Sequence, residues 1–151
     1  FVLLSAGLND VWCFIGGTWN LRVPINWNAP FVRPNLSQFW ANWNMTLMAV
    51  FRDYLFFNRW GLARPNLYLN TVIVFLTMGV WHALNWYWVL FGALHAAGFC
   101  AFLWFQQYKR RHPERWAEPT RVGRFAAWLV TYGFVCLCWY VPSKLVTWLG
   151  L

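Results

Sequence analysis

Charged side chains are scarce in this sequence of 151 residues: they make up 11% of it, and only 4 residues are acidic. Hydrophobic residues account for 60% of the chain, among them 14 tryptophans and 14 phenylalanines. An ordinary soluble domain carries roughly 25% charged and about 45–50% apolar residues. The composition therefore argues against such a domain and predicts a membrane protein, in which amphipathic aromatic rings collect at the membrane–water interfaces.

The sequence also lacks the cysteine and histidine patterns of redox and metal sites. Its 4 cysteines include no CxxC pair, and no cysteine–histidine cluster has the spacing of zinc ligands. His82 and His95 have no third candidate ligand at helical spacing. We therefore expect buried free thiols, no disulfide framework and no bound metal.

The net charge of +8 is concentrated beside apolar segments. Six of the 12 basic residues lie between Lys109 and Arg124, and Arg59 and Arg64 precede another apolar run. Such clusters are typical of cytoplasmic loops, and no recognised nucleic-acid motif accompanies them. We predict a basic cytoplasmic loop over about 106–124 and no nucleic-acid partner.

The N-terminal third alternates between apolar helix and polar breaks. Residues 1–19 are expected to form the end of a membrane helix, with Asp10 inside the membrane or at its surface. They lack a basic leader and a cleavage site, so we do not interpret them as a signal peptide. Three prolines predict a loop over 20–35. Residues 36–57 are predicted to form one helix, capped by Asn35.

Three apolar segments are predicted to span the membrane: 66–81, 89–105 and 125–141. Pro65 suits the first helical turn of the first span, whereas Pro142 and Lys144 should mark the end of the third. The first two spans form a hairpin that turns near 82–88, because this arrangement returns their basic ends to one side. Small residues at Gly92 and Ala96 allow close helix packing. The expected fold is an all-α, polytopic transmembrane protein with a single membrane domain over 1–151.

Two histidines lie where imidazole is hardest to solvate, and an ionisable residue in a membrane segment is by default a functional candidate. His82 sits where the helix pair turns, at a predicted mouth of a polar cavity, where neutral imidazole suits a general base. The alternative is a packing histidine bonded to a neighbouring carbonyl. That alternative is favoured for His95, which lies in mid-helix among small residues.

Two stretches resemble a known family. Residues 28–57 read NAPFVRPNLSQFWANWNMTLMAVFRDYLFF, and residues 78–98 read MGVWHALNWYWVLFGALHAAG. They are similar to the membrane-bound O-acyltransferases, in particular the bacterial branch that resembles alginate O-acetyltransferases, over roughly 24–100. The family pattern has F-W-x-x-W-[HN]-x-[ST]-L, then R-D-Y-L, then G-x-W-H-G followed by W-G-x-x-H. The matching residues are Phe39, Trp40, Trp43, Asn44, Thr46 and Leu47, then Arg52 to Leu55, then Gly79, Trp81, His82, Gly92 and His95.

The resemblance implies a site and a reaction. His82 matches the essential histidine of the family, and Asn44, expected to face inward, matches its upstream partner. The implied reaction moves an acyl group, with acetyl as our expectation, from acetyl-CoA or another thioester to a hydroxyl of a polysaccharide or other envelope acceptor, without a metal. Further candidates for substrate binding or for lining a central reaction cavity are Trp43, Trp81, Asn85, Arg52, Asp53 and His95.

The resemblance also implies a setting. Family members are longer, so we expect this chain to correspond to the C-terminal half of a multi-pass protein of the bacterial inner membrane. Expected partners are membrane lipid and envelope acyltransferase proteins. The main alternative is a non-enzymatic accessory subunit that keeps the fold, because fold does not imply function. A third reading makes His82 or His95 the axial ligand of a haem or pigment.

Overall fold

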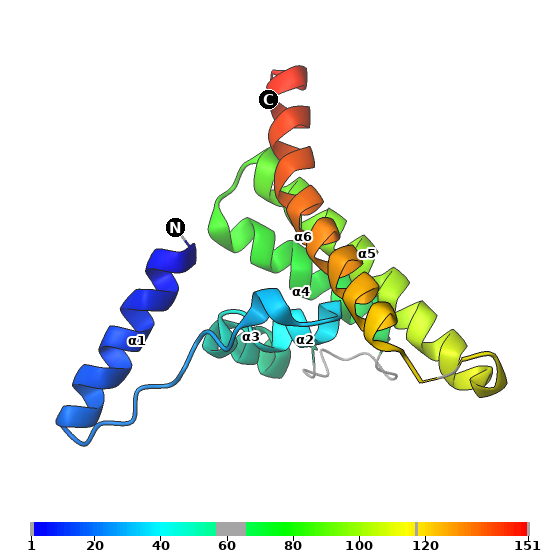
Figure 1. Cartoon of the computed structure of the whole chain (residues 1–151). Helices are drawn as coiled ribbons and strands as arrows, with labels where there is room; N and C mark the ends of the chain where they lie inside the picture. Colours follow the sequence, from blue (N-terminus) through cyan, green and yellow to red (C-terminus); the bar gives the residue numbers. More distant parts are fainter. Residues whose placement is uncertain (1, 57–65, 117, 151) are drawn as a thin grey trace.

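The computed structural model describes residues 2–56, 66–116 and 118–150, and every regular element in these ranges is a helix. The all-α expectation is therefore confirmed for the described residues. Figure 1 shows long helices crossing beside a group of short ones. In chain order the elements are α1 (Val2–Thr18), η1 (Pro30–Val32), α2 (Leu36–Ala41), α3 (Met45–Phe51), η2 (Arg52–Phe56), α4 (Leu67–His82), α5 (Trp86–Arg111), η3 (Pro113–Arg115) and α6 (Arg121–Leu149).

Helices α4 and α5 form the predicted hairpin, and asparagine side chains begin both of them. Asn66 accepts hydrogen bonds from the backbone N–H groups of Tyr68 and Leu69, so α4 starts at Leu67, one residue after the predicted start of the span. Pro65, like Arg59 and Arg64, lies outside the described residues. Asn85 accepts from the N–H of Trp88 at 3.1 Å. These caps satisfy N–H groups that a helix start leaves free.

Two glycines bring the hairpin backbones together, and the small-residue spacing predicted this for one of them, Gly92. A Cβ on Gly92 would lie 2.5 Å from the carbonyl oxygen of Phe75, and a Cβ on Gly79 would clash with the carbonyl oxygen of Trp88. Because these obstacles are backbone atoms, no side-chain rotation relieves them. Ala96, one turn after Gly92, is buried in the same contact region.

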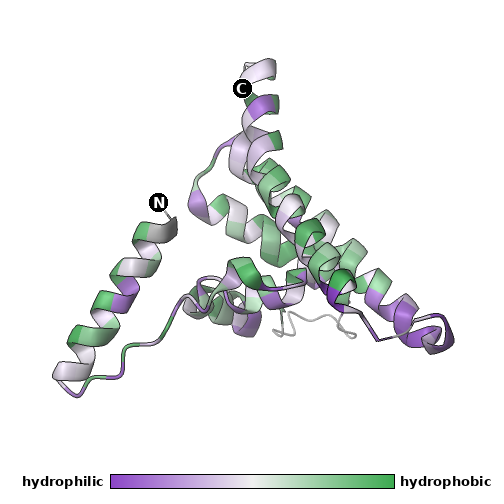
Figure 2. Cartoon of the chain, in the orientation of Figure 1, coloured by the Kyte–Doolittle hydropathy of each residue, from purple (hydrophilic) through white to green (hydrophobic). Residues whose placement is uncertain are grey.

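Two of the three predicted spans are long enough and apolar enough to cross a membrane. α5 has 26 residues and α6 has 29, whereas α4, the third, has 16. A span needs about 20 residues at 1.5 Å rise per residue. The α4–α5 hairpin and α6 form the long-helix group of Figure 1, in which apolar residues run along the helices and polar ones gather near the ends (Figure 2).

The end predicted for the third span is wrong, because α6 continues through Pro142 and Lys144 to Leu149. Proline removes one backbone hydrogen bond from a helix interior but leaves the bonds of the flanking turns. Because α6 has 29 residues, the hydrogen bonds of its other turns keep the helix continuous through Pro142. The Pro142 ring is fully buried. Tyr87 on α5 also donates a hydrogen bond to the carbonyl of Trp139 at 3.3 Å, close to the interruption.

The basic loop is shorter than the predicted range of 106–124. Helix α5 continues to Arg111, and α6 begins at Arg121, so the connection spans 112–120. Lys109, Arg110 and Arg111 occupy the last turn of α5, where cations complement the helix dipole and favour continued helix.

The predicted single helix over 36–57 is instead divided into α2, α3 and the π-helical η2, with Phe57 outside the described residues. The cap at Asn35 is confirmed, since its side chain accepts from the N–H of Gln38 at 2.9 Å. The break falls at Asn44, whose φ of 42° and ψ of 58° are left-handed. Asparagine tolerates this conformation better than most residues, so the helix stops there.

Helix α1 confirms the helical expectation for its segment and lies to one side of the other helices (Figure 1). Asn9 joins it to the loop that follows it. Asn9 accepts a hydrogen bond from the N–H of Asn26 at 2.8 Å and donates one to the carbonyl of Pro24 at 3.2 Å. Asp10 is exposed on this helix.

Candidate active site

His82 is the last residue of α4, and its ring is held by aromatic neighbours. It stacks on Trp88 with ring centroids 4.3 Å apart, and the ring of Trp81 meets it edge-on at 5.0 Å. The residue is exposed, and within the described structure its ring nitrogens have no hydrogen-bond partner. The arrangement fixes the plane of the imidazole while leaving its nitrogens open to a substrate proton.

His95 has the opposite surroundings. It is 1% exposed, and the rings of Trp40, Phe75, Phe91 and Phe134 surround it. Its Nδ1 lies 3.0 Å from the carbonyl oxygen of Phe91, so Nδ1 carries the hydrogen and donates it. The buried Nε2 has no partner in the described residues. These contacts fit the packing interpretation of His95.

The two histidines are separated by an aromatic ring rather than joined. The ring centroid of Phe91 lies 6.5 Å from that of His82 and 4.3 Å from that of His95. Of these two histidines, His82 has an accessible imidazole and His95 an enclosed one.

Asn44 lies in the turn between α2 and α3, half-buried, and its side chain makes no cap hydrogen bond. The turn is braced from the preceding loop by Asn26, whose carbonyl accepts from the N–H of Met45 at 2.9 Å. The Asn26 side chain accepts from the N–H of Thr46 at 3.0 Å. A left-handed non-glycine residue held in this way is the kind of backbone feature that collects at functional sites.

The structure does not bring Asn44 into hydrogen-bond contact with His82; their described contacts are separate. Their elements do meet through aromatic side chains: the rings of Phe51 on α3 and Trp81 on α4 have centroids 6.4 Å apart. The pairing implied by the sequence motifs therefore remains a prediction.

The other candidates have structural partners. Trp43 stacks on Phe39 with centroids 5.3 Å apart, and the Asn85 side chain is engaged in capping α5. Arg52 donates to the neighbouring Asp53 at 2.8 Å in an exposed ion pair. This hydrogen bond lowers the pKa of the Asp53 carboxyl below its ordinary value.

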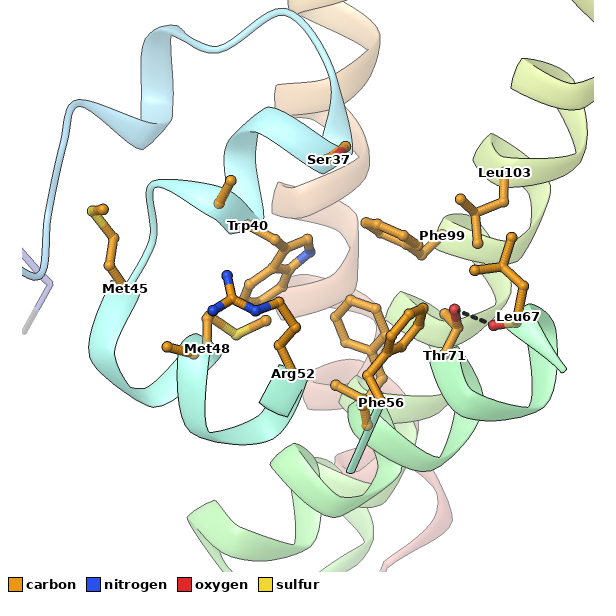
Figure 3. Close-up of a pocket in the computed structure, with 14 residues that line it drawn as sticks. Ser37, Trp40, Met45, Met48, Arg52, Phe56, Leu67, Thr71, Phe99 and Leu103 are labelled. Carbon is orange, nitrogen blue, oxygen red and sulfur yellow. Dashed lines mark hydrogen bonds between the residues drawn. The ribbon is translucent and has the colours of Figure 1, made fainter. Parts of the chain in front are cut away.

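A cavity of about 500 Å³ lies between the short helices and the α4–α5 hairpin (Figure 3). His82 and Asn44 do not line it, so this cavity is not the polar one expected at His82. Its walls are mainly apolar. The rings of Trp40 and Phe75 line the cavity and also pack against the ring of His95. The polar or charged side chains among its lining residues are Ser37, Arg52 and Thr71, of which Thr71 donates to the Leu67 carbonyl.

Two contributors to the site were not predicted from the sequence. Trp88 supports the His82 ring from across the hairpin turn, where helical periodicity no longer relates the two positions. Asn26 braces the Asn44 turn from a loop, at a separation of 20 residues from Thr46. The asparagines of that loop were the available signal, since they are frequent turn and bracing residues.

No family model matches the chain. The chain is 30% identical over 136 residues to a peptidoglycan O-acetyltransferase of Helicobacter pylori, covering 89% of this chain and 25% of that protein. It is 29% identical over 134 residues to a teichoic acid D-alanyltransferase of Bacillus subtilis, covering 82% and 33%. A probable alginate O-acetylase AlgI of Pseudomonas aeruginosa is 25% identical over 138 residues, covering 90% and 25%.

The chain thus spans about a quarter to a third of the length of these relatives. Two long apolar helices in a chain with such relatives are those of a membrane protein.

Proposed function

The chain is a homologue of the membrane-bound O-acyltransferases, and from this relationship we propose that the protein transfers an acyl group from a thioester to a hydroxyl of a cell-envelope polymer. Within the structure, the proposal rests on the surroundings of the His82 side chain. It is exposed, held flat against Trp88, and free of hydrogen bonds in the described structure, whereas His95 is enclosed. An oriented imidazole with an available nitrogen is what a general base requires.

In the proposed reaction, the unprotonated nitrogen of His82 accepts the proton of the acceptor hydroxyl as its oxygen attacks the thioester carbonyl. The tetrahedral intermediate collapses with loss of the thiolate, and the imidazolium returns the proton to that sulfur. A carbon–oxygen bond forms and a carbon–sulfur bond breaks, with no change of oxidation state. General-base catalysis of this kind contributes about 10²–10⁴-fold in rate.

Asn44 is proposed to position the substrate or to donate its amide N–H to the oxyanion. Preorganised donors of this type stabilise charge that develops in the transition state. The half-buried, unbonded side chain and the braced left-handed turn support this role. The role requires the substrate to lie between Asn44 and His82, because the described structure does not bond them directly.

The donor is proposed to be acetyl-CoA or another acyl thioester, with no metal. Acetyl is our choice because two of the three relatives described above are named for O-acetyl transfer, to peptidoglycan and to alginate, while the third is named for D-alanyl transfer. We further propose a multi-pass protein of the bacterial inner membrane that acts together with envelope acyltransferase partners.

The test is transfer of labelled acetyl from acetyl-CoA to envelope polymers in membranes that contain the full-length protein. His82→Ala should reduce transfer by at least a hundredfold, and Asn44→Ala should reduce it as well. His112→Ala, which removes the third histidine from the connection after α5, is the matched control and should retain activity. Detergent gel filtration checks that each variant folds. Equal labelling by wild type and a folded His82→Ala protein would overturn the general-base role and favour an accessory subunit.

A further inference from the structure

In the described structure, cations without acidic partners flank the connection between α5 and α6, in the last turn of α5 and the first turn of α6. Among the described residues, ion pairs at this end involve Glu114 with Arg115 and His112. The remaining five cations have no salt bridge in the described structure, and we call this group the basic end: Lys109, Arg110, Arg111, Arg121 and Arg124. In Figure 2 the polar colouring is strong along the last turn of α5 and the connection.

Helix stability explains only part of this charge. Lys109, Arg110 and Arg111 lie at the C-terminus of α5, where cations are favoured by the helix dipole. Arg121 and Arg124 instead lie in the first turn of α6, at the positive end of its dipole, and that turn contains no acidic residue. These two positive charges are unfavourable at the N-terminus of a helix, so the stability of α6 does not account for them.

Aromatic side chains border the basic end. Trp104 on α5 and Phe125 on α6 are exposed, and Lys109 lies over the ring of Trp116 at 5.3 Å. Tryptophan at the end of an apolar helix is typical of the headgroup region of a membrane. Since α5 and α6 are the two long apolar helices of the described chain, their shared end is placed at a membrane surface.

We propose that the basic end binds the phosphate headgroups of anionic phospholipids in the leaflet that it faces. The five unpaired cations supply the charge complement, and the bordering rings place that charge at headgroup depth. The inference stands independently of the acyltransferase proposal, because it uses neither His82 nor Asn44. The basic end then selects anionic over neutral phospholipids, in addition to orienting the chain in the membrane.

Native mass spectrometry of the purified protein, titrated with phosphatidylglycerol, measures this binding as an apparent affinity. The test variant carries Arg111→Gln, Arg121→Gln and Arg124→Gln. One basic residue near an anionic membrane surface contributes about fivefold in affinity, so the triple variant should bind phosphatidylglycerol more weakly on the order of a hundredfold. Raising the salt concentration should weaken the wild type as well.

Three controls separate the outcomes. The triple lysine variant at the same positions should keep the affinity, and Arg22→Gln, which removes an exposed charge elsewhere, should not change it. Phosphatidylcholine should bind weakly to all variants. Unchanged phosphatidylglycerol affinity in the folded glutamine variant, or equal affinity for phosphatidylcholine, would overturn the proposal. Displacement of the lipid by equimolar coenzyme A would also overturn it and assign the cations to the acyl donor.

Discussion

Replacing Gly92 by alanine should force the α4–α5 hairpin apart. The new Cβ would lie 2.5 Å from the carbonyl oxygen of Phe75, 3.2 Å from its carbonyl carbon and 3.3 Å from the Cα of Leu76. All three are backbone atoms, and a carbon–oxygen contact needs about 3.2 Å or more, so the helices must separate by roughly 0.7 Å. The rings around His95, which pack between these helices and their neighbours, would loosen with them.

Two opposing free energies set the size of the effect. Overpacking costs about 1–3 kcal/mol, and the upper part of that range, about 2–3 kcal/mol, applies here because the contacted backbone atoms cannot rotate away. Replacing glycine by alanine in a helix returns at most about 1 kcal/mol. The net loss in the free energy of unfolding should therefore be about 1–2 kcal/mol. For a chain of this size, that corresponds to a decrease in Tm of about 2–8 °C.

Thermal unfolding in detergent, followed by circular dichroism, measures this decrease against a matched variant. Gly133 lies inside α6, and a Cβ there would meet nothing within 4 Å. Gly133→Ala should therefore be neutral or slightly stabilising in the same assay. If Gly92→Ala and Gly133→Ala unfold at the same temperature, the backbone contact is not as close as the structure describes and the reasoning fails.

Substitutions at three further positions test the site and its supports. His95→Ala should lower the free energy of unfolding by about 2–4 kcal/mol through the cavity it leaves. His95→Phe should lower it less, because an aromatic ring, although a larger one, still fills the site and a buried unpartnered acceptor is removed; thermal unfolding compares the two. Asn85→Ala should cost about 1 kcal/mol by uncapping α5, and a stability equal to wild type would contradict the cap. Trp88→Ala should reduce acetyl transfer more than Trp88→Phe, because only phenylalanine keeps an aromatic face under His82; equal activities would mean that the stack does not orient the base.

Local signals in the sequence predicted the elements that depend on local chemistry. The cap at Asn35, the hairpin turn near 82–88 and the close approach at Gly92 each follow from a few neighbouring residues, and each is present in the structure. Motif order also led to the family that the comparisons support.

The errors lie where distant contacts or helix length outweigh a local signal. The break at Asn44 depends on hydrogen bonds that Met45 and Thr46 donate to Asn26, and no helical pattern contains such bonds. Pro142 indicates a helix end locally, yet α6 is long enough to continue through it. The stack of Trp88 on His82 crosses a turn, where helical spacing gives no relation between the residues. Packing partners of this kind are set by the folded chain rather than by its periodicity.

The hydrogen bonds of Asn26 have a mechanical consequence. Its N–H is bound by Asn9 of α1, while its carbonyl and side chain hold Met45 and Thr46, the two residues that follow Asn44. One residue therefore ties a peripheral helix to the strained turn of the site. A displacement of α1 relative to the other helices must either stretch these bonds or move the turn, so this asparagine couples the position of α1 to the backbone around Asn44.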